Sequence, residues 1–348
     1  MWKMAVAGAL VVLVAGVSGW ESWKEVEVEG PGPRAWATFT NVESHGSLLF
    51  GGHDGYGSLS DVWRFAGSVW NLLLTSGLSP ASRSQHASAA VGKDFYVFGG
   101  QHGTTIMSDM WHFEPAARIW SQITYSSELN PAPRSGHIME CAPDQSALFV
   151  FGGVVQFATS TSCTHSGEFW SLDLASLSWK QPEATTSLPS QRSRAASGVS
   201  KRRNLMFVFG GRFSCHDYTS SVRNDLWIYA FAANSWSPVS AANGPGRLQG
   251  SNMMYSELSD QLFIHGGQYG YTLSSVLYQL DLTAGQWHTL AAPSGRYGSA
   301  GVLIQSTIVI FGGVSSLTDY KDDAWSYELS VRKICGRGQV FNGTNCSD

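Results

Sequence analysis

Short apolar runs that end in a Gly-Gly pair recur six times along the chain. The runs read LLFGG, FYVFGG, LFVFGG, LMFVFGG, LFIHGG and IVIFGG. The five intervals between Gly51 and Gly312 give a period of about 52 residues. An uninterrupted apolar run of this length predicts a buried strand, and the glycine pair predicts a turn that needs positive φ.

Each glycine pair is followed by a strand-like segment with an aromatic residue, usually preceded two positions earlier by an acid. These aromatic residues are Trp63, Trp111, Trp170, Trp227, Tyr278 and Trp325. A second tryptophan then opens a further apolar/polar alternation, at Trp70, Trp120, Trp179, Trp236 and Trp287. A loop and an arginine complete the unit. The pattern predicts four short strands per unit, a to d, with the arginine before a, Gly-Gly after b, and the two aromatic residues in c and d.

Six copies of this pattern resemble kelch repeats, and the resemblance covers residues 20–331. It implies an all-β fold, a six-bladed kelch-type β-propeller in which each four-stranded antiparallel blade packs against its neighbours around a central channel. The sixth unit lacks a second tryptophan strand. The segment ESWKEVEVEGPGPR near the start has the missing form, because it matches WSPVSAANGPGR of the fourth unit. We therefore expect residues 22–28 to supply strand d of the last blade and to close the ring.

Composition restricts the class of partner. The formal net charge is −4, and Lys201 to Arg203 form the only basic run, so the sequence argues against nucleic acid as a partner. Residues 1–19 combine Lys3, an apolar stretch and a small-residue VSG end, which predicts a signal peptide. An uncleaved anchor is the alternative. Since no other segment resembles a membrane span, we expect a secreted or extracellular protein in an oxidising compartment.

The predicted topology brings the d–a and b–c loops to one face of the disc. In kelch domains this face commonly binds protein ligands, and the resemblance therefore points to the arginine that precedes each strand a. The candidate ring is Arg34, Arg83, Arg134, Arg192, Arg247 and Arg296. Such a ring could receive an acidic segment or a sulfated or carboxylated glycan. The alternative is that these arginines fix loop carbonyls in every repeat.

The recurring acids before the first aromatic residue have a structural interpretation of their own. They are Asp61, Asp109, Glu168, Asp225 and Asp323, and we expect them to cap the turns of their own b–c loops. Strands a and c of one blade lie about 9.6 Å apart at ordinary spacing. A direct arginine–acid pair within a blade is therefore not expected.

Departures from the repeat suggest further binding residues on the same face. The fifth unit has His265 where the others have Phe, lacks the acid, and carries GQYGYTL with Tyr269 and Tyr271 in its b–c loop. This loop is either a contact surface or a degenerate repeat. Candidate contacts in other b–c loops are His53, His102 and Arg212.

The b–c loops of units three and four are longer than the others, and each insertion holds one cysteine. We expect a disulfide between Cys163 and Cys215, because the two loops are adjacent, share a face and lie in an oxidising compartment. Residues 332–348 form a cysteine-containing tail that resembles the start of an EGF-like or cysteine-rich module. Cys335 and Cys346 either pair with each other or have partners further along a longer chain. Asn342 and Asn345 are predicted glycosylation sites.

Known catalytic patterns are missing from the sequence. No nucleophile elbow, P-loop or dinucleotide fingerprint is present, and the His53, Asp54 and His102 set lacks the tight spacing of a metal site. We predict no catalytic residue, no metal and no cofactor. The expected function is a non-catalytic module that binds a protein ligand. A carbohydrate-binding propeller is the first alternative, and a kelch-type metal-dependent oxidase or sugar epimerase is the second.

Overall fold

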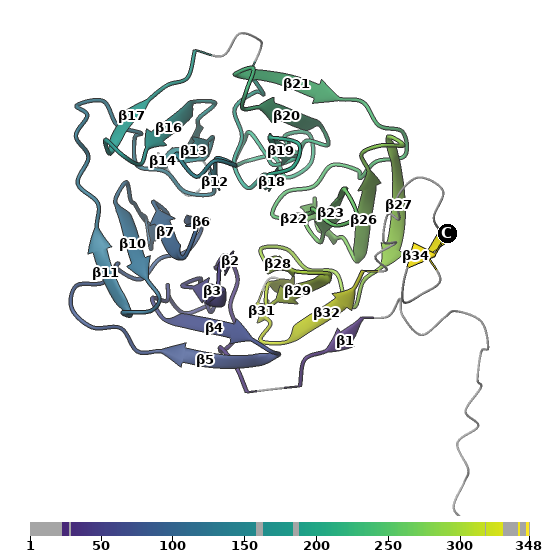
Figure 1. Ribbon diagram of the computed structural model, residues 1–348, viewed down its shortest axis with the longest axis horizontal. Coiled ribbons are helices and arrows are strands. Elements are labelled where there is room, and N and C mark those ends of the chain that lie inside the picture. Colours follow the sequence, from purple (N-terminus) through teal and green to yellow (C-terminus); the bar gives the residue numbers. More distant parts are fainter. Residues whose placement is uncertain are drawn as a thin grey trace, which may run out of the picture.

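Six four-stranded antiparallel sheets surround a common axis in the computed structural model (Figure 1). The structure describes residues 23–27, 29–157, 163–183, 188–316, 318–329, 340–341 and 346–347. These residues form strands and turns without an α-helix, so this part of the chain has no helix that could span a membrane. The predicted six-bladed propeller is confirmed.

Each blade runs from an inner strand a to an outer strand d. Blade one contains β2 (Thr38–Val42), β3 (Gly46–Phe50), β4 (Val62–Ala66) and β5 (Val69–Leu73). Blade two contains β6 (Ala87–Val91), β7 (Asp94–Phe98), β10 (Met110–Glu114) and β11 (Ile119–Gln122). Blade three contains β12 (Ile138–Cys141), β13 (Ala147–Phe151), β16 (Phe169–Asp173) and β17 (Ser178–Lys180).

The second half of the ring repeats the arrangement. Blade four contains β18 (Ala196–Ser200), β19 (Leu205–Phe209), β20 (Leu226–Ala230) and β21 (Ser235–Val239). Blade five contains β22 (Asn252–Ser256), β23 (Gln261–His265), β26 (Val276–Asp281) and β27 (Gln286–Ala291). Blade six contains β28 (Ala300–Ile304), β29 (Thr307–Phe311), β32 (Ala324–Glu328) and β1 (Lys24–Glu25).

The N-terminal segment closes the last blade, as the sequence predicted. Lys24 and Glu25 of β1 pair antiparallel with Ser326 and Trp325 of β32, and the two strands lie side by side in Figure 1. The paired stretch is shorter than the predicted residues 22–28. Trp23 stands where other blades carry the second tryptophan, since its ring lies 5.2 Å from that of Tyr327 and its Nε1 donates to Ala291 O at 2.8 Å.

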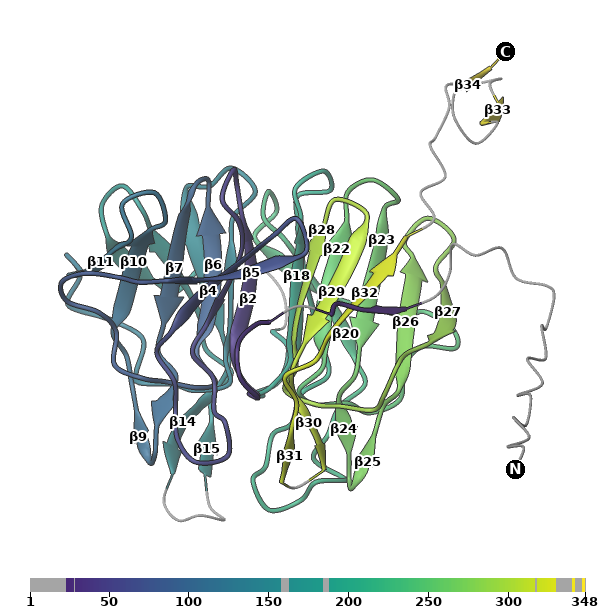
Figure 2. The ribbon, with the colours of Figure 1, turned by 90° about the horizontal axis from the view of Figure 1, so that it is seen from below.

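Four of the b–c loops form small hairpins that the sequence pattern did not predict. They are β8 (Gln101–His102) with β9 (Thr105–Ile106), β14 (Val154–Phe157) with β15 (Cys163–His165), β24 (Gln268–Tyr269) with β25 (Thr272–Leu273), and β30 (Val314–Ser316) with β31 (Asp319–Tyr320). All four project from one side of the disc (Figure 2). We call this side the b–c face and the opposite side, which carries the a–b turns, the a–b face.

The core consists of apolar layers between neighbouring blades. The second tryptophan of each blade reaches across to the preceding blade: the Trp70 ring lies 5.1 Å from Phe311 of blade six, and the Trp120 ring lies 5.1 Å from Phe50 of blade one. All four side chains are buried. This contact explains why the tryptophan recurs, because a large flat ring fills the widening outer part of each interblade gap.

A closed ring of backbone hydrogen bonds joins all six blades at the b–c end of the axis. One residue per blade takes part, and each donates its N–H to the carbonyl of the residue from the preceding blade at 2.7 to 3.0 Å. The six residues are Trp36, Gln85, Gly136, Arg194, Gly250 and Gly298. All six have φ between +53° and +63°, so the turn is left-handed in every blade.

Two long side chains lie across this ring. The Arg194 guanidinium stacks over the Trp36 ring at 4.6 Å, and its Nε donates to Gln85 Oε1 at 3.1 Å. Trp36 in turn covers the α-carbons of Gly250 and Gly298. Together the two side chains lie close to Gln85, Gly136, Gly250 and Gly298 and narrow the channel at the b–c end.

Candidate functional site

The recurring arginine, acid and tryptophan form one hydrogen-bonded unit inside each of five blades. In blade two, Arg83 Nη1 and Nη2 donate to Asp109 Oδ1 and Oδ2 at 2.9 and 2.8 Å, and Trp111 Nε1 donates to Asp109 Oδ2 at 2.6 Å. Arg83 Nη1 also donates to the carbonyl of Gly99 at 3.0 Å. The expectation that no direct arginine–acid pair would form is wrong. The arginine precedes strand a, and its long side chain crosses under the Gly-Gly turn to reach the acid.

The same unit recurs in four other blades, with two arginine–acid hydrogen bonds in three of them and one, from Arg134 Nη2 to Glu168 Oε2, in blade three. The additional ion pairs are Arg34–Asp61 at 2.6 Å, Arg134–Glu168 at 2.7 Å, Arg192–Asp225 at 2.8 Å and Arg296–Asp323 at 2.7 Å. Each acid also accepts a hydrogen bond from its tryptophan. The acids therefore do not act as turn caps, because their carboxylates point inward to bridge arginine and tryptophan.

The pKa values of these acids reflect the arginine partners. Burial alone would raise the pKa of Asp109, but hydrogen bonds from Arg83 and Trp111 and the charge of Arg83 hold it below its usual range. The pKa values of Asp61, Asp225 and Asp323 are lowered in the same way, each by its own arginine and tryptophan. The pairs consequently stay ionised at neutral pH.

Blade five replaces the whole unit with apolar residues. Gly211 N donates to Leu248 O at 2.9 Å, just as Gly52 N donates to Arg83 O at 2.9 Å, so Leu248 occupies the arginine position. The assignment of Arg247 to this position is wrong by one residue. Leu248 is buried whereas Arg247 is exposed, and Arg247 makes only long contacts of 3.5 and 3.4 Å to the Thr219 and Ser220 carbonyls.

The arginine ring is therefore a structural feature of the repeat. Five of the six candidates have side chains exposed by 4% or less, with their donors directed at a carboxylate and at the carbonyl of the first glycine of the pair. The alternative interpretation, arginines that fix loop carbonyls, describes these five residues. None of them offers a free guanidinium to a ligand on the surface.

Several other arginines on the b–c face lack a carboxylate partner within the described part of the chain, and two of them, Arg194 and Arg212, are close enough for their charges to interact. Arg212 follows the fourth Gly-Gly pair, is 5% exposed, and its Nε and Nη1 have no hydrogen-bond partner. Its guanidinium lies 5.2 Å from the Tyr218 ring centroid. Arg194 lies nearby on the axis. Burial, followed by the charge of Arg212, lowers the pKa of Arg194 to about 9.

His165 lies close enough to Arg212 and Arg194 for their positive charges to affect its pKa. Burial and then the charges of Arg212 and Arg194 lower the pKa of this histidine to about 4. The protein thus concentrates uncompensated positive charge at the centre of one face, although its formal net charge is −4. We call Trp36, Arg194, Arg212, Tyr218 and Tyr297 the mouth cluster; Tyr297 belongs to it because its ring packs on Trp36 at 5.2 Å.

The two longer b–c loops are crosslinked next to the mouth cluster. Cys163 and Cys215 form a disulfide with Cα atoms 5.9 Å apart, which is the pairing predicted from the two insertions. Arg212 Nη2 lies 3.9 Å from Cys215 Sγ. Cys163, His165 and Cys215 are also the one group of three possible metal ligands found in the described residues. Since both sulfurs are used in the disulfide, they are not thiolate ligands in this state.

Exposed aromatic side chains surround the mouth cluster on the b–c loops. Tyr271 is 92% exposed and Tyr269 40% exposed at the β24–β25 hairpin, and Tyr56 is 99% exposed in the loop of blade one. His102 is exposed and hydrogen-bonded to Ser82, and His53 packs against Tyr320 at 5.9 Å. His265, in contrast, is 1% exposed and packs against Trp23, so it belongs to the core.

Some sequence predictions fall outside the described residues. These are the signal peptide at 1–19, most of the tail at 332–348, Cys335, the side chain of Cys346, Asn342 and Asn345. Conversely, Arg194 was not among the predicted site residues. It occupies the position where blades three, five and six carry Gly136, Gly250 and Gly298, and the sequence repeat does not mark that position.

The blades, the Gly-Gly turns and the buried arginine–acid–tryptophan unit define a kelch propeller. Comparison with known families agrees: the model described as the KLHDC2/KLHL20/DRC7 Kelch-repeats domain matches residues 17–211, 110–292 and 203–336. The chain belongs to the kelch-repeat family.

Several curated proteins are similar over most of this chain. The leucine-zipper-like transcriptional regulator 1 homolog of Drosophila melanogaster is 24% identical over 83% of this chain and 30% of its own length. Multiple epidermal growth factor-like domains protein 8 of Rattus norvegicus is 27% identical over 75% of this chain and 10% of its own length. Acyl-CoA-binding domain-containing protein 5 of Arabidopsis thaliana is 27% identical over 76% of this chain and 42% of its own length. The chain thus spans less than half of each relative.

A solved structure shares the fold. The structure of YjhT aligns with a TM-score of 0.68 at 16% identity, over 86% of this chain and 96% of that chain. At this identity the similarity establishes the propeller architecture and nothing about activity.

Proposed function

We propose that this protein is a binding module that recognises an acidic protein segment through the b–c face. The observation that carries the proposal is the pair Arg194 and Arg212, which lacks a carboxylate partner among the described residues. A buried guanidinium with two unpaired donor nitrogens is costly, and a nearby carboxylate would lower that cost by compensating its charge and accepting a hydrogen bond. Kelch propellers suggest protein–protein interaction in general, and the mouth cluster gives this chain a specific anion-binding centre.

The surrounding aromatic side chains support a protein ligand. Tyr56, Tyr269 and Tyr271 are exposed on loops that project beyond the disc, where they offer large contact areas at low cost in side-chain entropy. In this arrangement the acidic group enters between the two arginines and the flanking residues of the ligand pack on the tyrosines. A sulfated glycan could use the same cations, but it would use the aromatic rim less fully.

A peptide-selection experiment tests the proposal. Random peptides displayed on phage are selected on the immobilised propeller, and we expect enriched sequences that combine Asp or Glu with apolar residues. Binding of a synthetic enriched peptide should fall at least tenfold in the Arg194→Gln/Arg212→Gln variant. The matched control is Arg118→Gln, which removes an exposed arginine from a c–d turn on the opposite face.

Two results would overturn the proposal. Selection of peptides without acids, or equal affinity of the double variant and the wild type, would exclude the arginine pair as the binding centre. Binding of sulfated oligosaccharides with no peptide enrichment would favour the carbohydrate alternative over the protein ligand.

We also propose that the chain follows the secretory pathway. The support is the signal-like segment at residues 1–19 and the Cys163–Cys215 disulfide, which forms and persists in oxidising compartments. N-terminal sequencing of protein recovered from the medium of expressing eukaryotic cells should begin at or near Trp20. Recovery in the cytosolic fraction with reduced cysteines would contradict it.

A further inference from the structure

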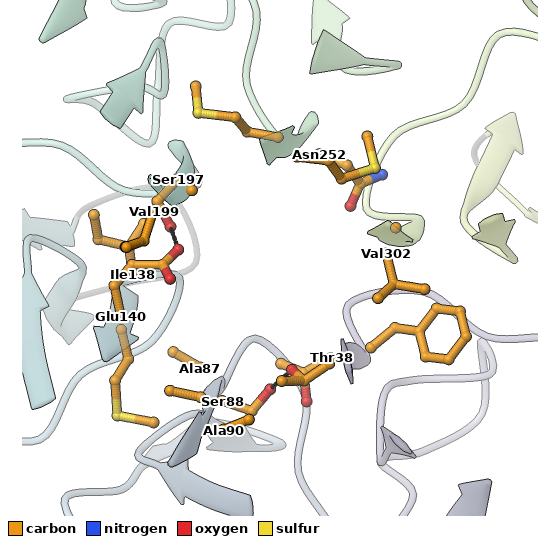
Figure 3. Close-up of a pocket in the computed structure, with 18 of the residues that line it drawn as sticks. Thr38, Ala87, Ser88, Ala90, Ile138, Glu140, Ser197, Val199, Asn252 and Val302 are labelled. Carbon is orange, nitrogen blue, oxygen red and sulfur yellow. Dashed lines mark hydrogen bonds between the residues drawn. The ribbon is translucent and has the colours of Figure 1, made fainter. Parts of the chain in front are cut away.

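The propeller axis contains a cavity of about 600 Å³, lined by the inner strands of all six blades (Figure 3). Gln145, Lys201 and Glu257 from a–b turns lie at one end of this cavity, so it opens toward the a–b face. The backbone ring with Trp36 and Arg194 narrows the other end. The cavity therefore has an entrance on the side opposite the mouth cluster.

Several polar groups on the wall of this cavity are paired with each other or with a neighbouring side chain. Thr40 and Ser88 share a hydrogen bond of 2.7 Å, Thr38 Oγ1 lies 2.9 Å from His86 Nε2, and Asn252 Nδ2 donates to Ser299 Oγ at 2.8 Å. Small and apolar side chains fill the space between them, including Ala87, Ala90, Val199 and Val302 (Figure 3). The wall is thus suited to a slender ligand with an aliphatic body.

Glu140 of β12 contributes a carboxylate to the cavity wall, and only one of its two oxygens accepts a hydrogen bond. Ser197 Oγ donates to Glu140 Oε1 at 2.7 Å, and Oε2 has no hydrogen-bond partner in the described part of the chain. Figure 3 shows the carboxylate on the cavity wall beside Ser197. Burial raises the pKa of Glu140 to about 7, which reflects the lack of a compensating cation.

The other titratable groups that line the cavity do not supply that cation. His86 and His137 are buried, and burial lowers the pKa of each, so both rings are neutral. Burial raises the pKa of the Cys141 thiol and of Tyr255 to about 12, so both are also uncharged at neutral pH. Lys201 and Glu257 are exposed at the rim and carry opposite charges. An ionised Glu140 is therefore the uncompensated charge of the cavity.

We propose that this cavity binds a small organic cation, with a primary ammonium group at Glu140 and an aliphatic body along the neighbouring wall formed by Ala87 and Val199. A divalent metal fits less well, because such ions require several oxygen ligands, and Glu140 is the one carboxylate of the lining that lies inside the cavity, since Glu257 lies at the rim. An ammonium group needs only one carboxylate and a neighbouring hydroxyl acceptor, and Ser197 provides the hydroxyl. The site is independent of the mouth cluster, since the two open on opposite faces.

Calorimetric titration with n-butylammonium chloride at pH 8 tests the site, because Glu140 is ionised at that pH. We expect n-butylammonium to bind at a single site. 1-Butanol should bind there at least tenfold more weakly, and butyrate should not bind. Glu140→Gln keeps the shape of the side chain and should lower the affinity for n-butylammonium at least tenfold. Glu114→Gln, an exposed acid on the outer part of blade two, should leave the affinity unchanged within twofold.

The outcomes separate this site from the proposed protein-binding face. Arg194→Gln/Arg212→Gln should retain n-butylammonium binding even if it loses acidic peptides. Absence of n-butylammonium binding to the wild type, equal binding to a folded Glu140→Gln variant, or equal binding of butyrate would each overturn the inference. Thermal unfolding of Glu140→Gln, which we expect at or above the wild-type temperature, shows whether the variant is folded.

Discussion

Arg83 and Asp109 form a bidentate ion pair in which the guanidinium is completely buried, while the carboxylate side chain remains 24% exposed. The pair links the loop before strand a to the b–c loop of the same blade. Three other blades repeat the bidentate pair, and blade three has a single hydrogen bond from Arg134 to Glu168, so the pair is a recurring polar link within the b–c face. Its energetic role can be tested by comparison with blade five, where Leu248 and Val276 occupy the equivalent positions.

Removing one partner should be more harmful than replacing the whole unit. Asp109→Asn leaves a buried arginine without its counter-charge, and we expect a loss of about 2 to 4 kcal/mol in the free energy of unfolding. The blade-five set, Arg83→Leu/Asp109→Val/Trp111→Tyr, should lose less than Asp109→Asn, because no buried charge is left unpaired. Urea unfolding followed by tryptophan fluorescence provides both values.

Arg247→Leu is the control for this comparison. It removes an exposed arginine with only long contacts and should change the free energy of unfolding by less than about 0.5 kcal/mol. A triple variant less stable than Asp109→Asn would contradict the view that the unit acts as a replaceable whole.

The repeat period predicted the strands well but could not place residues within the loops. Gly-Gly pairs and tryptophans mark strands b, c and d because a buried strand and a packed ring need specific residue types. The loop before strand a has no such marker in blade five, so Arg247 was aligned where Leu248 lies. Strand spacing does not predict the arginine–acid pair either, because it describes backbones, whereas the pair is formed by a long side chain that starts outside the strand.

The candidate site was less predictable than the fold. Arg212 could be named from its place after Gly-Gly, but Arg194 could not, because its importance depends on the left-handed turn that brings six loops to the axis. Glycine, glutamine, tryptophan and arginine all occupy that turn, so residue type alone gives no pattern. The axial cavity likewise depends on which faces of the inner strands meet, which requires the closed ring.

His265 gives the structure a pH dependence with a definite sign. Burial and then the charge of Arg296 lower the pKa of this histidine to about 3 in the folded state, compared with 6.5 for an ordinary histidine. Because the unfolded chain binds the proton more readily, stability is complete above pH 6.5 and falls as the pH drops toward 3. For this group alone, the loss between pH 7.5 and pH 5 is on the order of 2 kcal/mol.

His265→Phe should remove that part of the pH dependence. Phenylalanine stands at the equivalent position of the other five repeats, and neither ring nitrogen of His265 has a hydrogen-bond partner. We therefore expect the variant to be more stable than the wild type at pH 5, with a smaller gain at pH 7.5. Urea midpoints at the two pH values measure the effect. Parallel pH profiles of the variant and the wild type would contradict it.

The axial ring predicts a specific compensation between Gly298 and Trp36. A Cβ atom at Gly298 would lie 2.7 Å from the Trp36 ring, although the φ of +62° at this position is close to that of Trp36, Gln85 and Arg194 in other blades. The clash, more than the backbone, should therefore make Gly298→Ala destabilising, by about 1 to 3 kcal/mol. In a protein that already carries Trp36→Ala, Gly298→Ala should lower the stability less than it does in the wild type. A double-mutant cycle of thermal unfolding measures this difference. Strictly additive effects would mean that the ring and the Trp36 side chain are not coupled.

The Cys163–Cys215 disulfide should stabilise both the propeller and the mouth cluster. The crosslink joins blades three and four across a sequence separation of 52 residues, and Arg212 packs against its Cys215 sulfur. Replacing both cysteines by serine should lower the free energy of unfolding by about 2 to 4 kcal/mol. It should also weaken binding of the selected acidic peptide, because the loop that positions Arg212 loses its anchor.

A reductant distinguishes loss of the crosslink from an effect of the serines. Dithiothreitol should reduce the stability of the wild type toward that of the double variant, and it should leave the double variant unchanged. Cys141→Ser serves as the control, since Cys141 is a free thiol on β12 and its replacement does not touch the crosslink. If the wild type in dithiothreitol keeps both its stability and its peptide affinity, the disulfide does not hold the mouth cluster in place.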